Sequence, residues 1–228
     1  MRVSSGVPGF DQLIEGGLLS DRLYVISGPP GSGKTTFCSH FITQGAKKGE
    51  ECLYVTMHES KEVLLRDMSG FNFGFDRAIQ SDSIQFLNLV TESGKRTITQ
   101  FGTDGGLTNR LIAFIESNDI DRAVIDSTML LQHFFADGSE EITGFLSALK
   151  QTDATILLIS EMTDPTSYSD EHYLAHGVIF FHNFLDSDGM TRGIQVIKMR
   201  GTAIDSNIRQ LSFSDQGLRI HPDEQVQG

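Results

Sequence analysis

The sequence has few cysteines, few basic residues and no long apolar run. Cys38 and Cys52 are its only cysteines among 228 residues, and they flank a helix-like segment instead of forming a close metal-ligand pair. We therefore expect neither a disulfide framework nor a zinc knuckle. A reducing compartment fits this cysteine usage.

The shortage of positive charge bears on the choice of partners. There are 18 Lys plus Arg against 30 Asp plus Glu, which gives a formal net charge of −12. Because tight DNA binding needs a basic surface, this composition opposes nucleic acid as a partner. A proteome adapted to high salt is acidic throughout, so the charge is also a hint of a halophilic source.

Long apolar runs are missing from the whole chain. No stretch approaches the roughly 20 residues that span a bilayer, and the N-terminal segment MRVSSGVPGF lacks the apolar core of a signal peptide. We expect no membrane contact and a cytoplasmic location. The length suits one hydrophobic core, so residues 1–222 are expected to form a single domain and residues 223–228 a disordered tail.

Short apolar runs alternate with helix-like segments in the first two thirds of the chain. The expected strands are 23–27, 52–56, 84–89, 123–126 and 155–160. The expected helices are 34–48, 61–68, 107–116 and 141–150. This alternation predicts an α/β fold with a mainly parallel sheet flanked by helices. The polar segment 91–106 is expected to be a mobile loop.

Beyond residue 177 the pattern changes to strands joined by short turns. The expected strands are 178–185, 193–199, 208–213 and 218–221. Because the turns are too short for parallel crossovers, we expect these strands to extend the same sheet in an antiparallel fashion.

A glycine-rich segment between the first strand and the first helix matches the phosphate-binding pattern G-x-x-x-x-G-K-[ST]. Glycines let the backbone wrap so that N–H groups face the phosphates, and the helix N-terminus adds partial positive charge. Lys34 is expected to neutralise the β- and γ-phosphates of ATP, and the Thr35 hydroxyl to be a Mg²⁺ ligand. The expected nucleotide site comprises Gly28, Pro29, Pro30, Gly31, Ser32, Gly33, Lys34, Thr35 and Thr36.

Two carboxylates near strand ends are candidates for the remaining chemistry. Asp126 ends the apolar run AVID, where it could hold the water shell of Mg²⁺, although an Asp at this place is also an ordinary turn former. Glu59 follows the strand 52–56 and is expected at the same edge of the sheet. It could orient or deprotonate the attacking water, and the alternative is a glutamate beside a helix cap.

Lys198 and Arg200 are two residues apart on a strand-like run, so both side chains leave the same face of the sheet. Two cations on one face suit a phosphate, and the alternative is a solvated strand edge. Ser160 and Glu161 end the strand 155–160, where a polar residue could sense the γ-phosphate or simply form a turn.

Two further patterns are given structural interpretations. His172 and His176 have a spacing that metal ligands use, but with no third ligand in view we do not expect a shared metal. The Phe-rich stretches 71–75 and 134–135 are expected to be core or subunit contacts, because no basic residues interleave the aromatics as a base-stacking groove requires.

Taken in order, the motifs resemble the KaiC branch of the RecA superfamily from Gly6 to about Pro222. They are GVPGFDQLIEGG, SGPPGSGKTT, VTMHES, VIDS, GVIF and VIKMRGT. The resemblance implies a RecA-like P-loop ATPase core that assembles into a ring, usually a hexamer, with ATP held between subunits.

The resemblance also implies roles for individual residues. Residues 28–36 would be the Walker A loop, Asp126 the Walker B carboxylate and Glu59 a catalytic glutamate. Lys198 and Arg200 would reach the γ-phosphate of a neighbouring subunit's ATP, in the way that a trans arginine finger does.

The sequence departs from the family pattern at two places. His58 stands where the first of two adjacent glutamates is usual, which would slow hydrolysis or alter its pH dependence. Residues 203–205 follow KMRGT without the usual histidine, so contact with the neighbouring nucleotide is expected to differ. The clock protein of the KaiC branch carries two cores and a phosphorylated Ser-Thr pair in the second. This sequence has one core, so we do not carry autokinase activity over to it.

Three functions therefore remain in view. A slow, Mg-dependent ATPase that acts as an oligomeric regulatory switch, with an unidentified protein partner, is favoured by the intact loop and the acidic surface. A DNA-binding recombinase paralogue of the RecA type has the same core but usually adds a basic DNA-binding loop or domain, which the sequence lacks. An autokinase is the third, with the Ser and Thr residues between Thr163 and Ser169 as conceivable acceptors.

Overall fold

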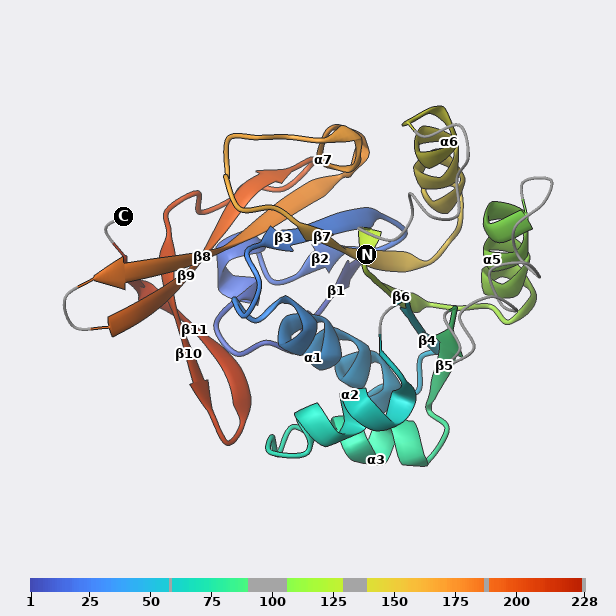
Figure 1. Ribbon diagram of the computed structural model, residues 1–228, viewed down its shortest axis with the longest axis horizontal. Helices are drawn as coiled ribbons and strands as arrows, with labels where there is room; N and C mark the ends of the chain where they lie inside the picture. The colour runs from blue at the N-terminus through green and yellow to red at the C-terminus, as the bar shows by residue number, and fades with distance from the viewer. Residues whose placement is uncertain (58, 90–105, 129–138, 187–188, 227–228) are drawn as a thin grey trace.

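The central feature of the fold is a nine-stranded sheet that crosses the whole molecule (Figure 1). The structure, a computed structural model, describes residues 1–57, 59–89, 106–128, 139–186 and 189–226. The strand order is β11-β10-β9-β8-β3-β7-β6-β4-β5. The strands are β3 (Leu23–Gly28), β4 (Cys52–Thr56), β5 (Ile84–Asn88), β6 (Arg122–Asp126), β7 (Thr155–Glu161), β8 (Gly177–Asp186), β9 (Gly189–Met199), β10 (Arg209–Ser214) and β11 (Gly217–Gln225).

The sheet has a parallel half and an antiparallel half. Strand β3 pairs in parallel with β7 and β8. Strand β6 pairs in parallel with β7 and with β4, and β4 pairs in parallel with β5. From β8 to β11 every pairing is antiparallel. All residues of β3 and β4 are buried, as expected for parallel strands covered on both faces. The predicted fold class, a mainly parallel sheet with an antiparallel C-terminal extension, is confirmed.

Helices cover both faces of the parallel half (Figure 1). The helices α1 (Lys34–Lys47), α2 (Lys61–Met68) and α3 (Phe75–Gln80) lie on one side, and α5 (Gly106–Ser117), α6 (Ser139–Leu149) and α7 (Asp170–Leu174) lie on the other. Side chains alternate along each strand, so Tyr24 and Ile26 enter the core under α1, whereas Leu23 and Val25 enter the core under α5 and α6.

Several elements were not expected from the sequence. Helix α3 forms inside the Phe- and Gly-rich connection, and α7 forms between β7 and β8. A short antiparallel pair, β1 (Arg2–Val3) and β2 (Leu18–Leu19), encloses the 3-10 helix η1 (Asp11–Ile14) near the N-terminus.

The C-terminal boundary also differs from the expected one. Strand β11 continues through Gln225, which pairs with Arg209. The expectation of a disordered tail from residue 223 is therefore wrong for residues 223–225, because the hydrogen-bonded pairing of β11 with β10 extends beyond Pro222. Of the expected loop 91–106, Gly106 begins α5 and the remainder lies outside the described residues.

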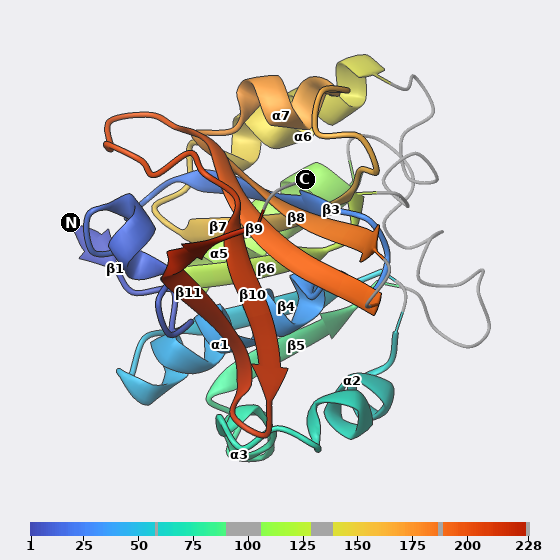
Figure 2. The same cartoon turned by 90° about the vertical axis from the view of Figure 1, so that its left-hand side faces the viewer.

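Hairpin β10–β11 runs along the molecule toward the segment between α2 and α3 (Figure 2). At its tip, the backbone N–H of Asn72 donates to the carbonyl oxygen of Asp215 at 2.6 Å. The C-terminal hairpin thus lies beside elements that come early in the chain, and it closes one side of the glycine-rich segment.

Candidate functional site

The glycine-rich segment forms a tight loop between the end of β3 and the start of α1. Gly28, Gly31 and Gly33 have φ angles of 146°, 72° and 110°, which side chains with a Cβ rarely adopt. A Cβ on Gly28 would lie 2.6 Å from the carbonyl oxygen of Phe181, and one on Gly33 would lie 2.8 Å from the Phe213 ring. Both backbone conformation and close packing therefore require glycine here.

Lys34 lies at the centre of this loop with 6% of its surface exposed. Its Nζ donates to the carbonyl oxygens of Gly28 at 2.8 Å and Pro29 at 2.9 Å. It also forms an ion pair with Glu161, at 3.3 Å from Oε1. Glu161, which ends β7, is thus a direct neighbour of the loop lysine, whose ammonium group has the chemistry to bind phosphate oxygens in place of these partners.

Asp126 and Thr35 are brought together from different elements. The Thr35 hydroxyl donates to Asp126 Oδ2 at 3.3 Å, and the Tyr54 hydroxyl donates to the same oxygen at 3.1 Å. Burial, and then the charge of Asp126, raises the pKa of Tyr54 well above its usual value, so its phenol stays protonated and acts as the donor.

This pair fits a magnesium ion by its chemistry. A hydroxyl and a carboxylate are the hard oxygen donors that Mg²⁺ prefers, and in phosphate-transfer sites the metal takes its other ligands from water and phosphates. Across the described part of the chain, no group of three or more His, Cys, Asp or Glu side chains gathers as a metal site of its own. The residues that would hold a magnesium ion here are Thr35 and Asp126.

A cavity of about 340 Å³ opens over the loop. Besides loop residues it is lined by Asp126, Ile159, Glu161 and Phe213. Phe213 comes from β10 and is 37% exposed, and the Arg192 guanidinium lies 5.4 Å from the centroid of its ring. Sequence reasoning missed Phe213 and Arg192, because nothing local shows that hairpin β10–β11 bends back over the loop.

Glu59 lies just beyond β4, at the edge of the sheet where β4 and β6 end. Its backbone N–H donates to the Thr56 hydroxyl at 3.1 Å, and Thr56 pairs with Asp126 in the sheet. The side chain is exposed and does not line the cavity over the loop. Ser60, not Glu59, caps α2 by accepting from Val63 N at 3.3 Å. His58 lies outside the described residues.

Lys198 and Arg200 lie at the other end of the sheet from the glycine loop. Met199, between them, pairs with Gly177, which pairs with Tyr24 near the start of β3. Gly28 is four residues further along β3, which corresponds to about 13 Å. Lys198 Nζ donates to the carbonyl oxygens of His172 at 3.1 Å and Tyr173 at 3.0 Å, and Arg200 Nη2 donates to Tyr173 O at 3.2 Å. The two side chains do share one direction, toward α7.

The histidine pair has separate partners and does not converge. His172 Nε2 lies 2.7 Å from the Ser27 hydroxyl, whereas His176 Nδ1 accepts from Leu23 N at 3.1 Å. Phe73, from the first Phe-rich stretch, stacks on His40 with ring centroids 3.9 Å apart and belongs to the core. The stretch 134–135 lies outside the described residues.

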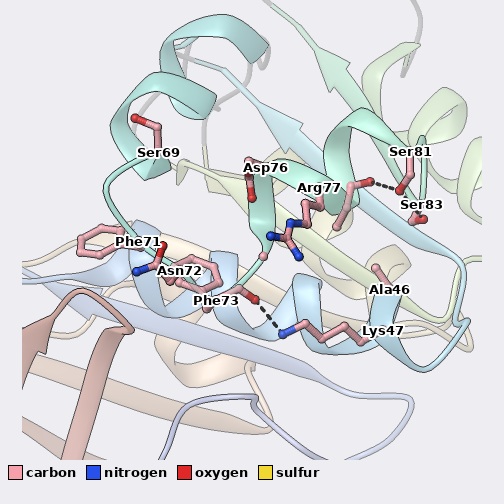
Figure 3. A pocket seen from close by; sticks show the side chains of 12 residues that line it. Ala46, Lys47, Ser69, Phe71, Asn72, Phe73, Asp76, Arg77, Ser81 and Ser83 are labelled. Atoms are coloured by element: carbon pink, nitrogen blue, oxygen red, sulfur yellow. Dashed lines mark hydrogen bonds between the residues drawn. The ribbon is translucent and has the colours of Figure 1, made fainter.

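A second cavity of about 510 Å³ lies away from this chemistry (Figure 3). It is lined by α3, by the segment that joins α2 to α3, and by Ala46 and Lys47 at the end of α1, where Lys47 Nζ donates to Phe73 O at 2.7 Å. Lys47 is 13 residues beyond Lys34, about 20 Å along the helix axis. Despite its larger volume, this cavity lacks the glycine loop, which lines the smaller one.

A strand, a glycine loop and a helix that starts with Lys-Thr, beside an aspartate at the end of another strand of the same sheet, define a P-loop protein on a RecA-like sheet. The KaiC ATPase family model matches residues 3–225. The chain belongs to this family and is a KaiC-like P-loop ATPase of the RecA superfamily.

Individual relatives agree with this assignment. The circadian clock protein KaiC3 of Synechocystis sp. is 28% identical over 88% of this chain, and a KaiC of Prochlorococcus marinus is 26% identical over 97%. The chain spans 41% and 46% of those two proteins. A UPF0273 protein of Thermotoga maritima is 27% identical and matches over 98% of its own length.

A solved structure shares the fold over nearly the full length. The crystal structure of a KaiC-like protein from Pyrococcus horikoshii OT3 superposes with a TM-score of 0.83 and 26% identity, covering 97% of this chain and 99% of that one. Among the helices that the structure of our chain describes, none is long and apolar enough to cross a bilayer.

Proposed function

We propose that the protein binds ATP with Mg²⁺ and hydrolyses it at sites that form between neighbouring subunits of a ring, usually a hexamer in this family. One observation carries the proposal. The P-loop and the cation pair Lys198 and Arg200 lie at opposite ends of the sheet, so one chain cannot bring both to the same nucleotide. Head-to-tail assembly joins the P-loop end of one copy to the cation end of the next.

Within this proposal each residue has a defined task. The amides of residues 28–36 hold the phosphates, Lys34 exchanges Glu161 for the β- and γ-phosphates, and Thr35 and Asp126 hold magnesium. A bound Mg²⁺ would neutralise phosphate charge.

Two side chains at the rim of the site have further tasks. The ring of Phe213, next to Gly33, offers a surface on which an adenine ring can stack. Glu59 orients the water that attacks the γ-phosphorus, and in doing so it must turn toward the cavity that it does not line here.

The neighbour's Arg200 and Lys198 stabilise the charge that develops on the transferred phosphoryl group, as trans arginine fingers do. Hydrolysis then depends on assembly, and assembly can report the nucleotide state to a protein partner. The net charge of −12 speaks against DNA as that partner. No observation favours the autokinase alternative.

Two substitutions test the proposal, because one should remove hydrolysis and the other should remove ATP binding. Arg200→Ala should bind ATP as well as the parent in calorimetry but lose hydrolysis by about a thousandfold, whereas Lys34→Ala should lose binding itself. Arg219→Ala, which removes an exposed arginine from β11, serves as the matched control and should keep both properties. Full hydrolysis by Arg200→Ala, or full ATP binding by Lys34→Ala, would overturn the proposal.

A further inference from the structure

Helix α7 contacts both ends of the sheet that the proposed function assigns to nucleotides. It is only five residues long, Asp170–Leu174, and it packs beside α6 on the face opposite α1 (Figure 1). At its C-terminal end, its last carbonyl groups have no partner within the helix. Two of them, those of His172 and Tyr173, accept from Lys198 and Arg200 as described above.

Toward the P-loop, α7 makes two side-chain contacts, one buried and one partly buried. His172, 3% exposed, contacts the hydroxyl of Ser27 on β3 at 2.7 Å, and Glu171 Oε1 accepts from the hydroxyl of Ser160 on β7 at 2.8 Å. Each serine directly precedes a partner of Lys34, since Gly28 follows Ser27 and Glu161 follows Ser160. Both contacts therefore end one residue from a group that binds the phosphate-binding lysine.

The ring of His172 has a defined hydrogen-bonding pattern. Its Nδ1 accepts from the backbone N–H of Ser169 at 3.2 Å, so this nitrogen carries no proton, and Nε2–H donates to Ser27. Burial lowers the pKa of His172, and the charge of Lys198 lowers it further, while Glu171 opposes the shift. A neutral imidazole thus caps the start of α7 with one nitrogen and holds β3 with the other.

We propose that α7 couples the two nucleotide sites in which each subunit takes part, with His172 as the positioning residue. A phosphate that draws Lys34 away from Gly28 O and Glu161 changes the strand ends at Ser27 and Ser160. The contacts to His172 and Glu171 pass this change to α7, whose carbonyls hold Lys198 and Arg200. A subunit then presents its cations to the neighbour only when its own site holds ATP. This inference rests on the proposed function.

Mixed rings provide the test, because coupling changes the shape of a titration curve. Lys34→Ala chains, which lack ATP, are mixed in rising proportion with parent chains, and ATPase activity is normalised to that of the parent. If every subunit presents Lys198 and Arg200 to its neighbour whether or not it holds ATP, activity at equal mixing falls to about one half. If an empty subunit also withholds its cations, activity falls to about one quarter.

The same titration is repeated in chains that carry His172→Asn. Asparagine can still accept from Ser169 N and keep the cap of α7, but it is too short to reach Ser27. We expect the curve to become linear, with about one half of the activity at equal mixing. Thr152→Val, which removes the hydrogen bond from Thr152 Oγ1 to Leu149 O at the end of α6, is the control and should keep the steeper curve. Loss of packing alone lowers the activity but leaves this shape unchanged.

Superimposable curves in the parent and His172→Asn backgrounds would overturn the coupling. Ser27→Ala breaks the same contact from the other side and replaces His172→Asn if that chain does not fold. Failure of the proposed function gives a different signal. If the proposed function is wrong, Arg200→Ala chains hydrolyse ATP at the parent rate without any change to α7. If it is right, a titration that mixes Arg200→Ala chains with parent chains gives the linear curve in both backgrounds.

Discussion

Replacing Glu161 by glutamine should tighten the binding of ATP. Lys34 Nζ is paired with Glu161 at 3.3 Å, and an arriving triphosphate must compete with this carboxylate for the same ammonium group. Glutamine keeps the size of the side chain but removes its negative charge. The substitution therefore weakens a competitor and also removes a charge that repels phosphate.

The size of the effect follows from how exposed the pair is. The Lys34 side chain is 6% exposed, but that of Glu161 is 35% exposed, so solvent screens much of the attraction. We take about 1 kcal/mol, near the upper end for exposed pairs, and not the several kcal/mol of a fully buried one. This corresponds to a Kd for ATP that is about fivefold lower.

Calorimetric titration with ATP, with and without Mg²⁺, measures this Kd. Asp153→Asn is the matched control, because it removes an exposed carboxylate just before the other end of the same strand, β7. It should leave the Kd unchanged. If Glu161→Gln binds ATP with unchanged or weaker affinity, Lys34 does not exchange Glu161 for phosphate, and the reasoning fails.

Three further outcomes are expected. Phe213→Ala should weaken ATP binding about tenfold through lost stacking but leave the binding of inorganic triphosphate unchanged, and equal losses for both ligands would contradict a base contact. Arg122→Met should lower the free energy of unfolding by about 3 kcal/mol, since Arg122 is fully buried, binds Glu50 and donates to the carbonyls of Ser4 and Phe41. An unchanged free energy of unfolding in a denaturant titration would refute this. Burial lowers the pKa of His40 to about 4. As the pH falls, the His40 imidazole is therefore protonated in the unfolded chain before it is protonated in the folded chain, and stability present above about pH 6.5 is lost as the pH falls toward 4. His40→Gln should reduce that slope by about 1.4 kcal/mol per pH unit, and an unchanged slope in denaturant titrations would exclude His40 as its source.

Features encoded by adjacent residues could be predicted from the sequence. The P-loop is one, because its glycines and Lys34 are determined by the local backbone and by phosphate chemistry. The change from parallel to antiparallel strands beyond residue 177 is another, because loop length alone decides between the two. Asp126 beside Thr35 also follows, since parallel strands place their ends at one edge of the sheet.

Features that depend on distant segments could not be predicted in this way. Phe213 reaches the cavity over the glycine loop only because its hairpin bends back over that loop. His172 was considered only as half of a metal pair, whereas its partners Ser27 and Ser169 are 145 and 3 residues away in the chain. Helix α7 is too short to give a periodic pattern, and it is stabilised by tertiary contacts.

Specific activity measured against protein concentration tests the shared site most directly. Initial ATPase rates per chain are determined from dilute to concentrated protein with saturating ATP and Mg²⁺, while light scattering records the molar mass. We predict that the rate per chain rises with concentration in step with assembly. A constant rate per chain from protein that scatters as a monomer would contradict the account, because one chain would then contain every group that hydrolysis requires.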